Sequence, residues 1–344
     1  MTKEQKILLT GVKPTGRPHI GNYFGAMKQV IDRQNDFETN LIFIADLHAL
    51  TTTQNATELN QDALDIAIDY LALGLDPAKA VLFRQSSVPA HSELCWIFNC
   101  ITTVPYLQRA HAYKDATTKN HEVSVGTFDY PLLMAADILL YDTDVVPVGQ
   151  DQKQHVEIAR DTAEKFNRLF GETFKMPEPL ILDSVKTVPG IDGQKMSKSY
   201  GNTIPLFATD EEIKTQVMKI VTDSKTPEEP KDPAKCHIFA LHELFASPEE
   251  LATLRQRYEA GGIGYKESKE ILIANMIKFI APLRERRVEI AKDPAKVLEI
   301  LKQGSEQARE LAEKKIGEIK MKTGLACEIR ISNQMGDEVI VTKK

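Results

Sequence analysis

The chain has 344 residues, of which 42% are hydrophobic and 27% are charged, and its formal net charge is −6 at pH 7. This length suits roughly two domains, the composition is typical of soluble globular proteins, and no apolar run approaches the ~20 residues of a membrane span. Because the first residues, MTKEQK, lack the apolar core of a secretory signal, we expect a cytoplasmic protein. The negative charge argues against wholesale coating of nucleic acid but leaves room for a local basic face.

The cysteines give no sign of a metal centre. Cys95, Cys100, Cys236 and Cys327 form no CxxC pair and do not cluster with histidine. We therefore expect no zinc or iron–sulfur site held by the protein. Free thiols in a reducing compartment are the simpler interpretation.

The first predicted unit is a strand, a glycine-rich loop and a helix. Residues 6–10 (KILLT) form a short apolar run, residues 11–25 read GVKPTGRPHIGNYFG, and residues 24–32 have helical spacing of apolar side chains. In this arrangement free backbone N–H groups at a helix N-terminus face the end of a parallel strand. The positive end of the helix dipole adds to the attraction, so we expect an anionic group, such as a phosphate, to bind there.

The residue types in this loop exclude two common nucleotide motifs. The loop is neither GxxxxGK[ST] nor GxGxxG, so P-loop and nicotinamide-binding readings are disfavoured. Gly21 would let a bulky ring lie against the backbone, where a side chain would block it. His19 and Asn22 add side-chain donors to the first turn.

The next segments alternate between strand and helix. Residues 40–45 are an unbroken apolar run, residues 57–73 have helical spacing, and residues 80–83 read as a third strand. This alternation predicts a doubly wound parallel sheet, which binds ligands beyond the carboxyl ends of its strands. Asp46 and His48 fall at such an end. They either bind a ligand, or Asp46 caps a helix and the His48 ring packs in the core.

The alternation breaks between residues 85 and 127. Residues 90–100 look helical and contain the only tryptophan, Trp96. A polar, partly basic stretch follows, and its composition is equally compatible with a solvated surface segment. Its charged and titratable residues are Arg109, His111, Lys114, Lys119 and His121.

A second helix, predicted from residue 130, carries an unusual combination of side chains. Spacings of four and three residues place Tyr130, Met134 and Asp137 on one face. An ionised carboxylate removed from water needs a hydrogen-bond donor. An indole N–H, which donates and does not accept, is its complement, and an adaptable thioether can pack on the indole ring. The alternative is that Asp137 bonds a neighbouring backbone group.

Another strand end follows. Residues 145–148 read as a strand, the next four are Gly149, Gln150, Asp151 and Gln152, and a helix continues to about residue 169. From sequence alone, Asp151 could be a plain helix N-cap.

A lysine-rich segment lies far downstream of the first loop. It reads KMSKS over residues 195–199, after PGIDG at 189–193 and before Gly201. Two lysines and two hydroxyls on a glycine-flanked loop suit a mobile cationic clamp on a leaving pyrophosphate. Most short lysine pairs, by contrast, are simply solvated loop.

The remainder is predicted to be helical, apart from a proline- and charge-rich loop at 222–235 and a terminal β-hairpin of 327–331 and 338–341. The predicted helices cover residues 210–221, 238–245, 248–259, 266–287 and 294–315. Basic residues on them either meet phosphates or form a solvated face. They include Lys266, Lys269, Arg284, Arg286 and Arg287.

The two loop motifs together resemble the signatures of class I aminoacyl-tRNA synthetases. HIGN and KMSKS occur in the family's order and at its distance; Asn22 replaces the usual final histidine of the first motif, and the second matches in full. The resemblance implies a Rossmann-like, HUP-type catalytic domain over residues 1–204, with a connective insertion at about 85–127 that carries dimer contacts. It implies a helical anticodon-binding domain over 205–290, and a C-terminal helix that returns to the catalytic domain plus a hairpin tail over 291–344.

The family also implies roles for individual residues. The segment around Tyr130, Met134 and Asp137 is similar to that of tryptophan-activating members, whereas tyrosine-activating relatives tend to carry glutamine where Met134 stands. The implied amino-acid pocket is Tyr130, Met134, Asp137, Gln152, Val146, Val148 and His48. The implied ATP contacts are Lys13, Pro14, Thr15, Gly21, Asn22, Gly149, Gln150, Asp151, Lys195, Met196, Ser197, Lys198 and Ser199. The residues expected to act in the chemical step are His19, Asn22, Lys195 and Lys198.

The reaction implied is ATP-dependent activation of tryptophan, with Mg²⁺ on the phosphates, followed by transfer to tRNA(Trp) by a homodimer. Lys13 departs from the common bacterial form of the loop, which has glutamine there. The alternatives are a tyrosine-activating relative, a small nucleotidyltransferase with a similar first loop, and a non-catalytic RNA-binding paralogue. The nucleotidyltransferase would lack the helical half, and the paralogue would not need an intact KMSKS.

Overall fold

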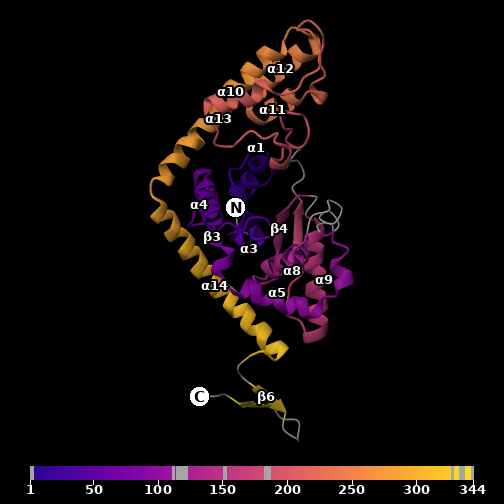
Figure 1. Ribbon diagram of the computed structural model, residues 1–344, viewed down its shortest axis with the longest axis vertical. Coiled ribbons are helices and arrows are strands. Elements are labelled where there is room, and N and C mark those ends of the chain that lie inside the picture. Colours follow the sequence, from indigo (N-terminus) through magenta and orange to yellow (C-terminus); the bar gives the residue numbers. More distant parts are fainter. Residues whose placement is uncertain are drawn as a thin grey trace.

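A five-stranded parallel sheet forms the centre of the N-terminal half (Figure 1). This computed structural model describes residues 4–110, 113, 123–149, 153–181, 187–326, 329–332 and 338–341. The strands are β1 (Glu4–Val12), β2 (Phe37–Ile44), β3 (Val81–Arg84), β4 (Val145–Val148) and β5 (Glu178–Ile181). Their order is β3-β2-β1-β4-β5, and every adjacent pair is parallel. The predicted doubly wound sheet is thus confirmed, with its switch point between β1 and β4, where such folds bind ligands.

The core lies on both faces of this sheet, and β2 shows why. Successive side chains of a strand point to opposite faces. Ile42 and Ile44 accordingly belong to one buried cluster, and Leu41 and Phe43 belong to the other. All four are 4% exposed or less, which explains the continuous apolar run that predicted this strand.

Helical segments separate the strands along the chain. They are α1 (Ile20–Asn22), continued by a π-helical turn (Tyr23–Met27) and α2 (Lys28–Asp32), then α3 (Asp46–Ala49), α4 (Ala56–Ala72), α5 (Ala90–Ile101), α6 (Val104–Leu107), α8 (Val125–Leu139) and α9 (Lys153–Phe170). Helix α8 begins five residues before the predicted start because Ser124 caps it, accepting a hydrogen bond from the Thr127 N–H at 3.2 Å. Strand β5 was not predicted, since its sequence, EPLI, contains a proline; an edge strand tolerates one.

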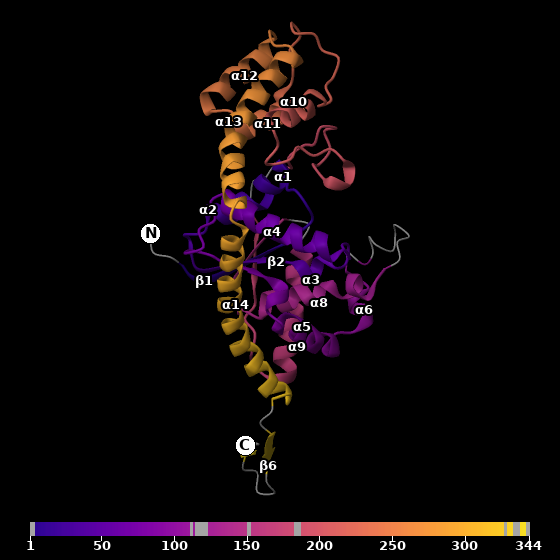
Figure 2. The same cartoon turned by 60° about the vertical axis from the view of Figure 1, so that its left-hand side comes forward.

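The C-terminal half is helical, with α10 (Asp210–Met218), α11 (His237–Phe245), α12 (Pro248–Ala260), α13 (Tyr265–Ala291) and α14 (Pro294–Thr323). Figure 2 shows α10, α11 and α12 gathered at one end of the molecule, with α13 and α14 running from there along its length. A two-stranded antiparallel hairpin, β6 (Ile329–Ser332) and β7 (Glu338–Val341), lies beyond α14. Among the described helices, none is long and apolar enough to cross a membrane.

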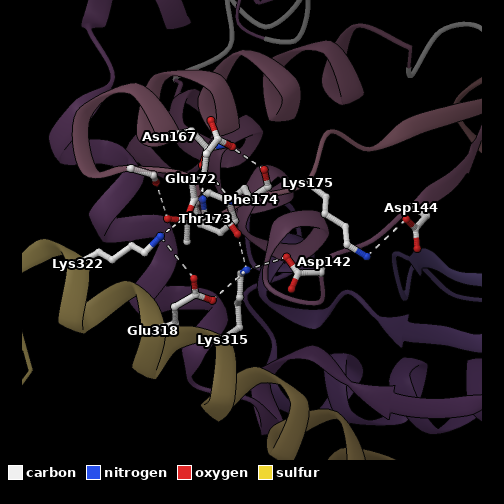
Figure 3. Close-up of polar contacts among 11 residues, drawn as sticks. Asp142, Asp144, Asn167, Glu172, Thr173, Phe174, Lys175, Lys315, Glu318 and Lys322 are labelled. Atoms are coloured by element: carbon white, nitrogen blue, oxygen red, sulfur yellow. Dashed lines mark hydrogen bonds and ion pairs between the residues drawn. The ribbon is translucent and has the colours of Figure 1, made fainter.

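Helix α14 packs tightly against the sheet. A side chain at Gly304 would lie 2.0 Å from the Leu82 carbonyl oxygen of β3, so glycine is required there. Near its end, the buried Lys315 ammonium contacts Asp142 at 2.8 Å and lies over the Phe174 ring, 5.4 Å from its centre (Figure 3). The same ammonium donates to the Thr173 carbonyl. These contacts fix the last helix to the turns before β4 and β5.

Candidate active site

The first loop is organised by a reciprocal cap. The Asn22 N–H donates to His19 Nδ1 at 3.2 Å, and the His19 N–H donates to Asn22 Oδ1 at 3.1 Å. Asn22, which stands in place of the family's usual histidine, is therefore half of a capping box. Burial, and secondarily the positive charge of Lys198, lowers the pKa of His19 to about 4. The imidazole is neutral at pH 7, and because Nδ1 accepts a hydrogen bond, Nε2 carries the proton.

The second motif packs directly on the first. The Ile20 N–H donates to the Ile204 carbonyl at 3.1 Å, and the Leu206 N–H donates to the Pro18 carbonyl at 2.9 Å. The Lys198 ammonium donates to the Thr15 carbonyl. Two segments separated by more than 180 residues therefore meet, as the family resemblance implied.

Gly21 lies close to the second motif. A Cβ atom there would lie 2.8 Å from His19 Nδ1 and 3.3 Å from the Met196 Cβ. Glycine is thus needed for the loops to approach each other as well as for access by a ligand. Met196 itself is 4% exposed, packs in the core, and its N–H donates to the Val188 carbonyl at 3.0 Å. The Met196 side chain thus anchors the loop, and its contact with ATP stays a prediction.

Asn202 holds the lysine-rich loop in shape and was not predicted. Its side chain is nearly inaccessible, accepts from the Ser197 N–H at 2.8 Å, and donates to Asp192 at 2.7 Å and to the Lys195 carbonyl at 3.1 Å. Gly201 precedes it in the left-handed conformation at φ 64°. A glycine followed by asparagine, one residue beyond the motif, was the available signal of such a turn.

A cavity of about 470 Å³ opens beside these loops, a size typical of small-molecule sites. It is lined by residues of β1, β2, α3, α8 and β4. The lining includes the predicted residues Lys13, His48, Tyr130, Met134, Asp137, Val146, Val148 and Gly149. It also includes Leu9, Phe43, Thr51 and Ile138, apolar or small residues that sequence reasoning missed.

Asp137 is fully buried at this cavity and has three protein donors. Gln85 Nε2 lies 2.7 Å from Oδ1, His91 Nδ1 lies 2.6 Å from Oδ1, and His48 Nε2 lies 2.8 Å from Oδ2. Burial alone would raise the pKa of this carboxyl, but the hydrogen bonds from His48 and His91 outweigh burial and lower it to about 2. Asp137 is thus ionised at neutral pH. Because three protein groups already donate to it, Asp137 does not require a ligand N–H, contrary to the expectation from sequence.

The comparisons with known proteins fit this geometry. Residues 1–281 match the family model described as tRNA synthetases class I (W and Y). The chain belongs to this family. Two curated relatives are the tryptophan–tRNA ligases of Rhodopirellula baltica and Fusobacterium nucleatum, each 48% identical; they align over 92% and 93% of this chain and 99% and 98% of their own lengths.

Solved structures of the family place the chain in its tryptophan branch. The tryptophanyl-tRNA synthetase of Campylobacter jejuni complexed with ADP and tryptophan has a TM-score of 0.87 at 45% identity, over 93% of this chain and 100% of that chain. A tyrosyl-tRNA synthetase from Archaeoglobus fulgidus is 22% identical over 83% of this chain and 91% of that chain, with a TM-score of 0.65, which shows the shared fold alone.

Three of the synthetase residues predicted from sequence cannot be placed. Gln150, Asp151 and Gln152 lie outside the described part of the chain, as do His111, Lys114, Lys119 and His121 of the insertion. The neighbouring Gly149 is described and lines the cavity at the end of β4. Tyr130, the other predicted ammonium contact, hydrogen-bonds through its hydroxyl to His155 Nε2.

Four basic residues of α13, Lys269, Arg284, Arg286 and Arg287, make contacts within the protein. Arg287 pairs with Asp65 at 2.7 Å and with Asp69 on α4, and Arg284 pairs with Asp210 at 2.9 Å. Lys269 donates to the carbonyls of Met218 and Ile220 at 2.9 and 2.7 Å, and Arg286 donates to that of Ala72 at 3.2 Å. These side chains join the helical half together and to the sheet domain. For these four residues, the structure favours neither of the two predicted roles, phosphate contact or solvated face. Lys266, the fifth residue named from the sequence, is exposed, which fits a solvated face.

Proposed function

We propose that the protein activates L-tryptophan with ATP and then transfers the tryptophanyl group to tRNA(Trp). The observation that carries the proposal is the meeting of the two loops: Lys198 of KMSKS bonds the Thr15 carbonyl beside HIGN, next to a cavity with a buried acid. The identity of 41–48% to tryptophan–tRNA ligases over 92–93% of the chain supports the same substrate.

In the first step the tryptophan carboxylate attacks the α-phosphorus of ATP, and pyrophosphate leaves. The neutral His19 offers its Nε2–H to a phosphate oxygen, and Asn22 holds that ring in place. Lys195 and Lys198 offset the charge that builds on the leaving pyrophosphate. The protein supplies position and charge, and no covalent intermediate is required. Pro14, Thr15, Ser197, Ser199 and the segment Gly149–Asp151 complete the proposed ATP site.

Mg²⁺ enters with the substrate. Among the described residues there is no group of three or more histidine, cysteine or acidic side chains that could hold a metal ion. The phosphates of ATP are themselves good ligands for this cation. We therefore place Mg²⁺ on the nucleotide and assign it no protein ligand.

Tryptophan is favoured over tyrosine by the cavity lining. Met134, Val146 and Val148 present apolar surface to the flat indole ring, and Asp137 presents an acceptor to its N–H. His48 closes one side, and Tyr130 with Gln152 is proposed to hold the ammonium group. Phenylalanine would leave the acceptor unpaired, which costs about 1–3 kcal/mol.

In the second step the terminal 2′-hydroxyl of the tRNA attacks the carbonyl of the adenylate, and AMP leaves. The helical half, from α10 to α13, is proposed to bind the anticodon. We propose that the protein is located in the cytoplasm, in keeping with the free thiols of Cys95, Cys100 and Cys236.

The proposal is tested by amino-acid-dependent exchange between ATP and pyrophosphate, run with tryptophan, tyrosine and phenylalanine. Exchange with tryptophan alone is the expected result. Exchange with tyrosine would favour a tyrosine-activating enzyme, and no exchange with any amino acid would favour an RNA-binding paralogue. Charging of tRNA(Trp) with labelled tryptophan then tests the second step.

We further propose a homodimer formed through the insertion. Trp96 on α5 is 70% exposed, Val104 on α6 is 57% exposed and Val125 on α8 is 80% exposed. Trp96 and Gly126 line one surface hollow of about 250 Å³, and large exposed apolar groups of this kind mark contact surfaces. Sedimentation is expected to give twice the chain mass of 38.5 kDa.

Trp96→Glu is expected to weaken this dimer about 30-fold or more, because a buried tryptophan is commonly an energetic centre of an interface. Sedimentation equilibrium measures the dissociation constant. Val288→Glu is the matched control, since Val288 is 55% exposed on α13, away from the insertion. An unchanged dimer in the Trp96 variant would exclude this interface.

Lys13→Gln is expected to change the KM for tryptophan or ATP about 3- to 10-fold, while altering stability by about 1 kcal/mol or less. Lys13 lines the cavity, its ammonium donates to Thr51 Oγ1 at 3.1 Å, and burial lowers its pKa. A cation there is poised to reach the substrate carboxylate or the α-phosphate. Steady-state exchange kinetics and thermal melts measure the two effects, with Lys28→Gln as a control for loss of one charge. Equal kinetics in the two forms would reject the role.

A further inference from the structure

A chain of buried polar groups lies behind Asp137. His91 Nδ1 is 2.6 Å from Asp137 Oδ1, and His91 Nε2 is 2.8 Å from the Tyr141 hydroxyl. His91 is fully buried and Tyr141 is 4% exposed. The rings of Phe83 and Phe43 pack beside His91, with centroids 6.3 and 6.0 Å away. Neither His91 nor Tyr141 was among the site residues predicted from the sequence.

The direction of each hydrogen bond follows from charge. Asp137 is ionised and can only accept, so His91 Nδ1 donates to it. Burial, and secondarily the charge of Asp137, raises the pKa of Tyr141 well above its usual value, so its hydroxyl keeps its proton. In a neutral imidazole whose Nδ1 donates, Nε2 is the acceptor, so the Tyr141 hydroxyl donates to Nε2 and fixes the Nδ1–H tautomer.

The other partners of the carboxylate are fixed as well. Gln85 Oε1 accepts from the Leu47 N–H at 3.2 Å, which turns the Gln85 amide so that its Nε2 donates to Asp137 Oδ1 at 2.7 Å. Oδ1 therefore accepts two hydrogen bonds, from Gln85 and His91. Among the described residues, Oδ2 accepts only one, from His48 at 2.8 Å.

One acceptor position of the carboxylate is thus left over, and it is on Oδ2. Asp137 and His48 both line the cavity proposed to hold the amino acid, whereas Gln85, His91 and Tyr141 do not. Oδ1, which already accepts two hydrogen bonds, faces the buried partners. Oδ2, which accepts one, is on the side of His48.

We propose that His91 and Tyr141 are positioning residues for tryptophan selectivity: they hold the Asp137 carboxylate so that Oδ2, beside His48, receives the indole N–H. The inference rests on the proposed function. Neither residue touches the substrate. Their effect reaches the substrate only through the orientation of Asp137.

Three variants test the inference by exchange kinetics. His91→Leu removes the donor to Oδ1 and is expected to raise the KM for tryptophan about 10-fold, with a much smaller change in kcat. His91→Asn places an amide N–H near the position of Nδ1 and is expected to restore most of the affinity. Tyr141→Phe frees the tautomer of His91 and is expected to raise the KM about 3-fold.

An analogue without the indole N–H separates positioning from general damage. In β-(3-benzothienyl)alanine, sulfur replaces the N–H group. In the wild-type protein the analogue is expected to show a higher KM than tryptophan. The KM of the analogue divided by that of tryptophan is expected to fall about 10-fold in His91→Leu, because the variant loses affinity only for the amino acid that carries the indole N–H. A merely structural role would raise both KM values equally and leave the ratio unchanged, which would overturn the proposal.

His242→Leu is the matched control. Like His91, His242 on α11 is fully buried; one of its ring nitrogens hydrogen-bonds to Ser268 at 3.0 Å, and it lies in the helical half. Its KM ratio is expected to equal that of the wild type. If His91→Leu does not fold, Tyr141→Phe carries the ratio test. If the wild type gives no exchange with tryptophan, the proposed function has failed, and this outcome differs from normal exchange with unchanged ratios.

Discussion

Replacing Asp137 by alanine is expected to raise the KM for tryptophan about 10- to 100-fold, since a hydrogen bond to a charged group in a dehydrated site contributes about 1.5–3 kcal/mol. The carboxylate is fully buried at the cavity and keeps one acceptor position free. The variant should also discriminate less between tryptophan and phenylalanine. Exchange kinetics with both amino acids measure the effect.

Loss of Asp137 also leaves the donors of Gln85, His91 and His48 without their acceptor, so a fall in thermal stability is expected in the same variant. Asp137→Asn preserves volume and tests the charge alone. A thermal melt shows whether each variant is folded at the assay temperature. A folded Asp137→Ala protein with the wild-type preference for tryptophan would show that the acid does not select the substrate.

Replacing Lys195 by alanine is expected to lower the rate of tryptophan activation about 100-fold and to change the KM for tryptophan little. Removal of one group that stabilises transition-state charge commonly has an effect of this size. Lys195 is exposed, and its backbone carbonyl accepts a hydrogen bond from Asn202 Nδ2 at 3.1 Å. Its ammonium is therefore presented on a fixed turn. Single-turnover formation of the adenylate measures the rate.

Two variants control for the loss of a lysine. Lys195→Arg keeps the charge and should retain more activity than Lys195→Ala. Lys214→Ala removes an exposed lysine from α10 and should behave like the wild type. An unchanged activation rate in Lys195→Ala would remove this residue from the chemical step.

The sequence supported the sheet and the two loops because their signals are local. Continuous apolar runs marked β2, and residues 145–148 matched β4 to the residue. The glycines and the HIGN and KMSKS segments marked the loops, and only the family resemblance joined them across the chain. Strand β5 was not predicted, because a proline stands in it where β-branched residues are usual, which an edge strand tolerates.

The residues behind the site could not be predicted for a different reason. Gln85 and His91 hydrogen-bond to Asp137 from 52 and 46 residues away in the sequence, and Tyr141 reaches Asp137 through His91. A single sequence contains no signal for such contacts, and a lone histidine on a helix reads as ordinary core. Asn202 was closer to being predictable, because it follows Gly201, which lies one residue beyond the KMSKS motif.

The central claim is that the two loops hold one triphosphate while Asp137 holds the indole, and it is tested most directly by a crystal structure with tryptophan and a non-hydrolysable ATP analogue. The indole nitrogen is expected about 2.7–3.2 Å from Asp137 Oδ2. The phosphates are expected between His19 and the ammonium groups of Lys195 and Lys198. Phosphates that touch only one loop, or an indole nitrogen away from the carboxylate, would contradict the claim.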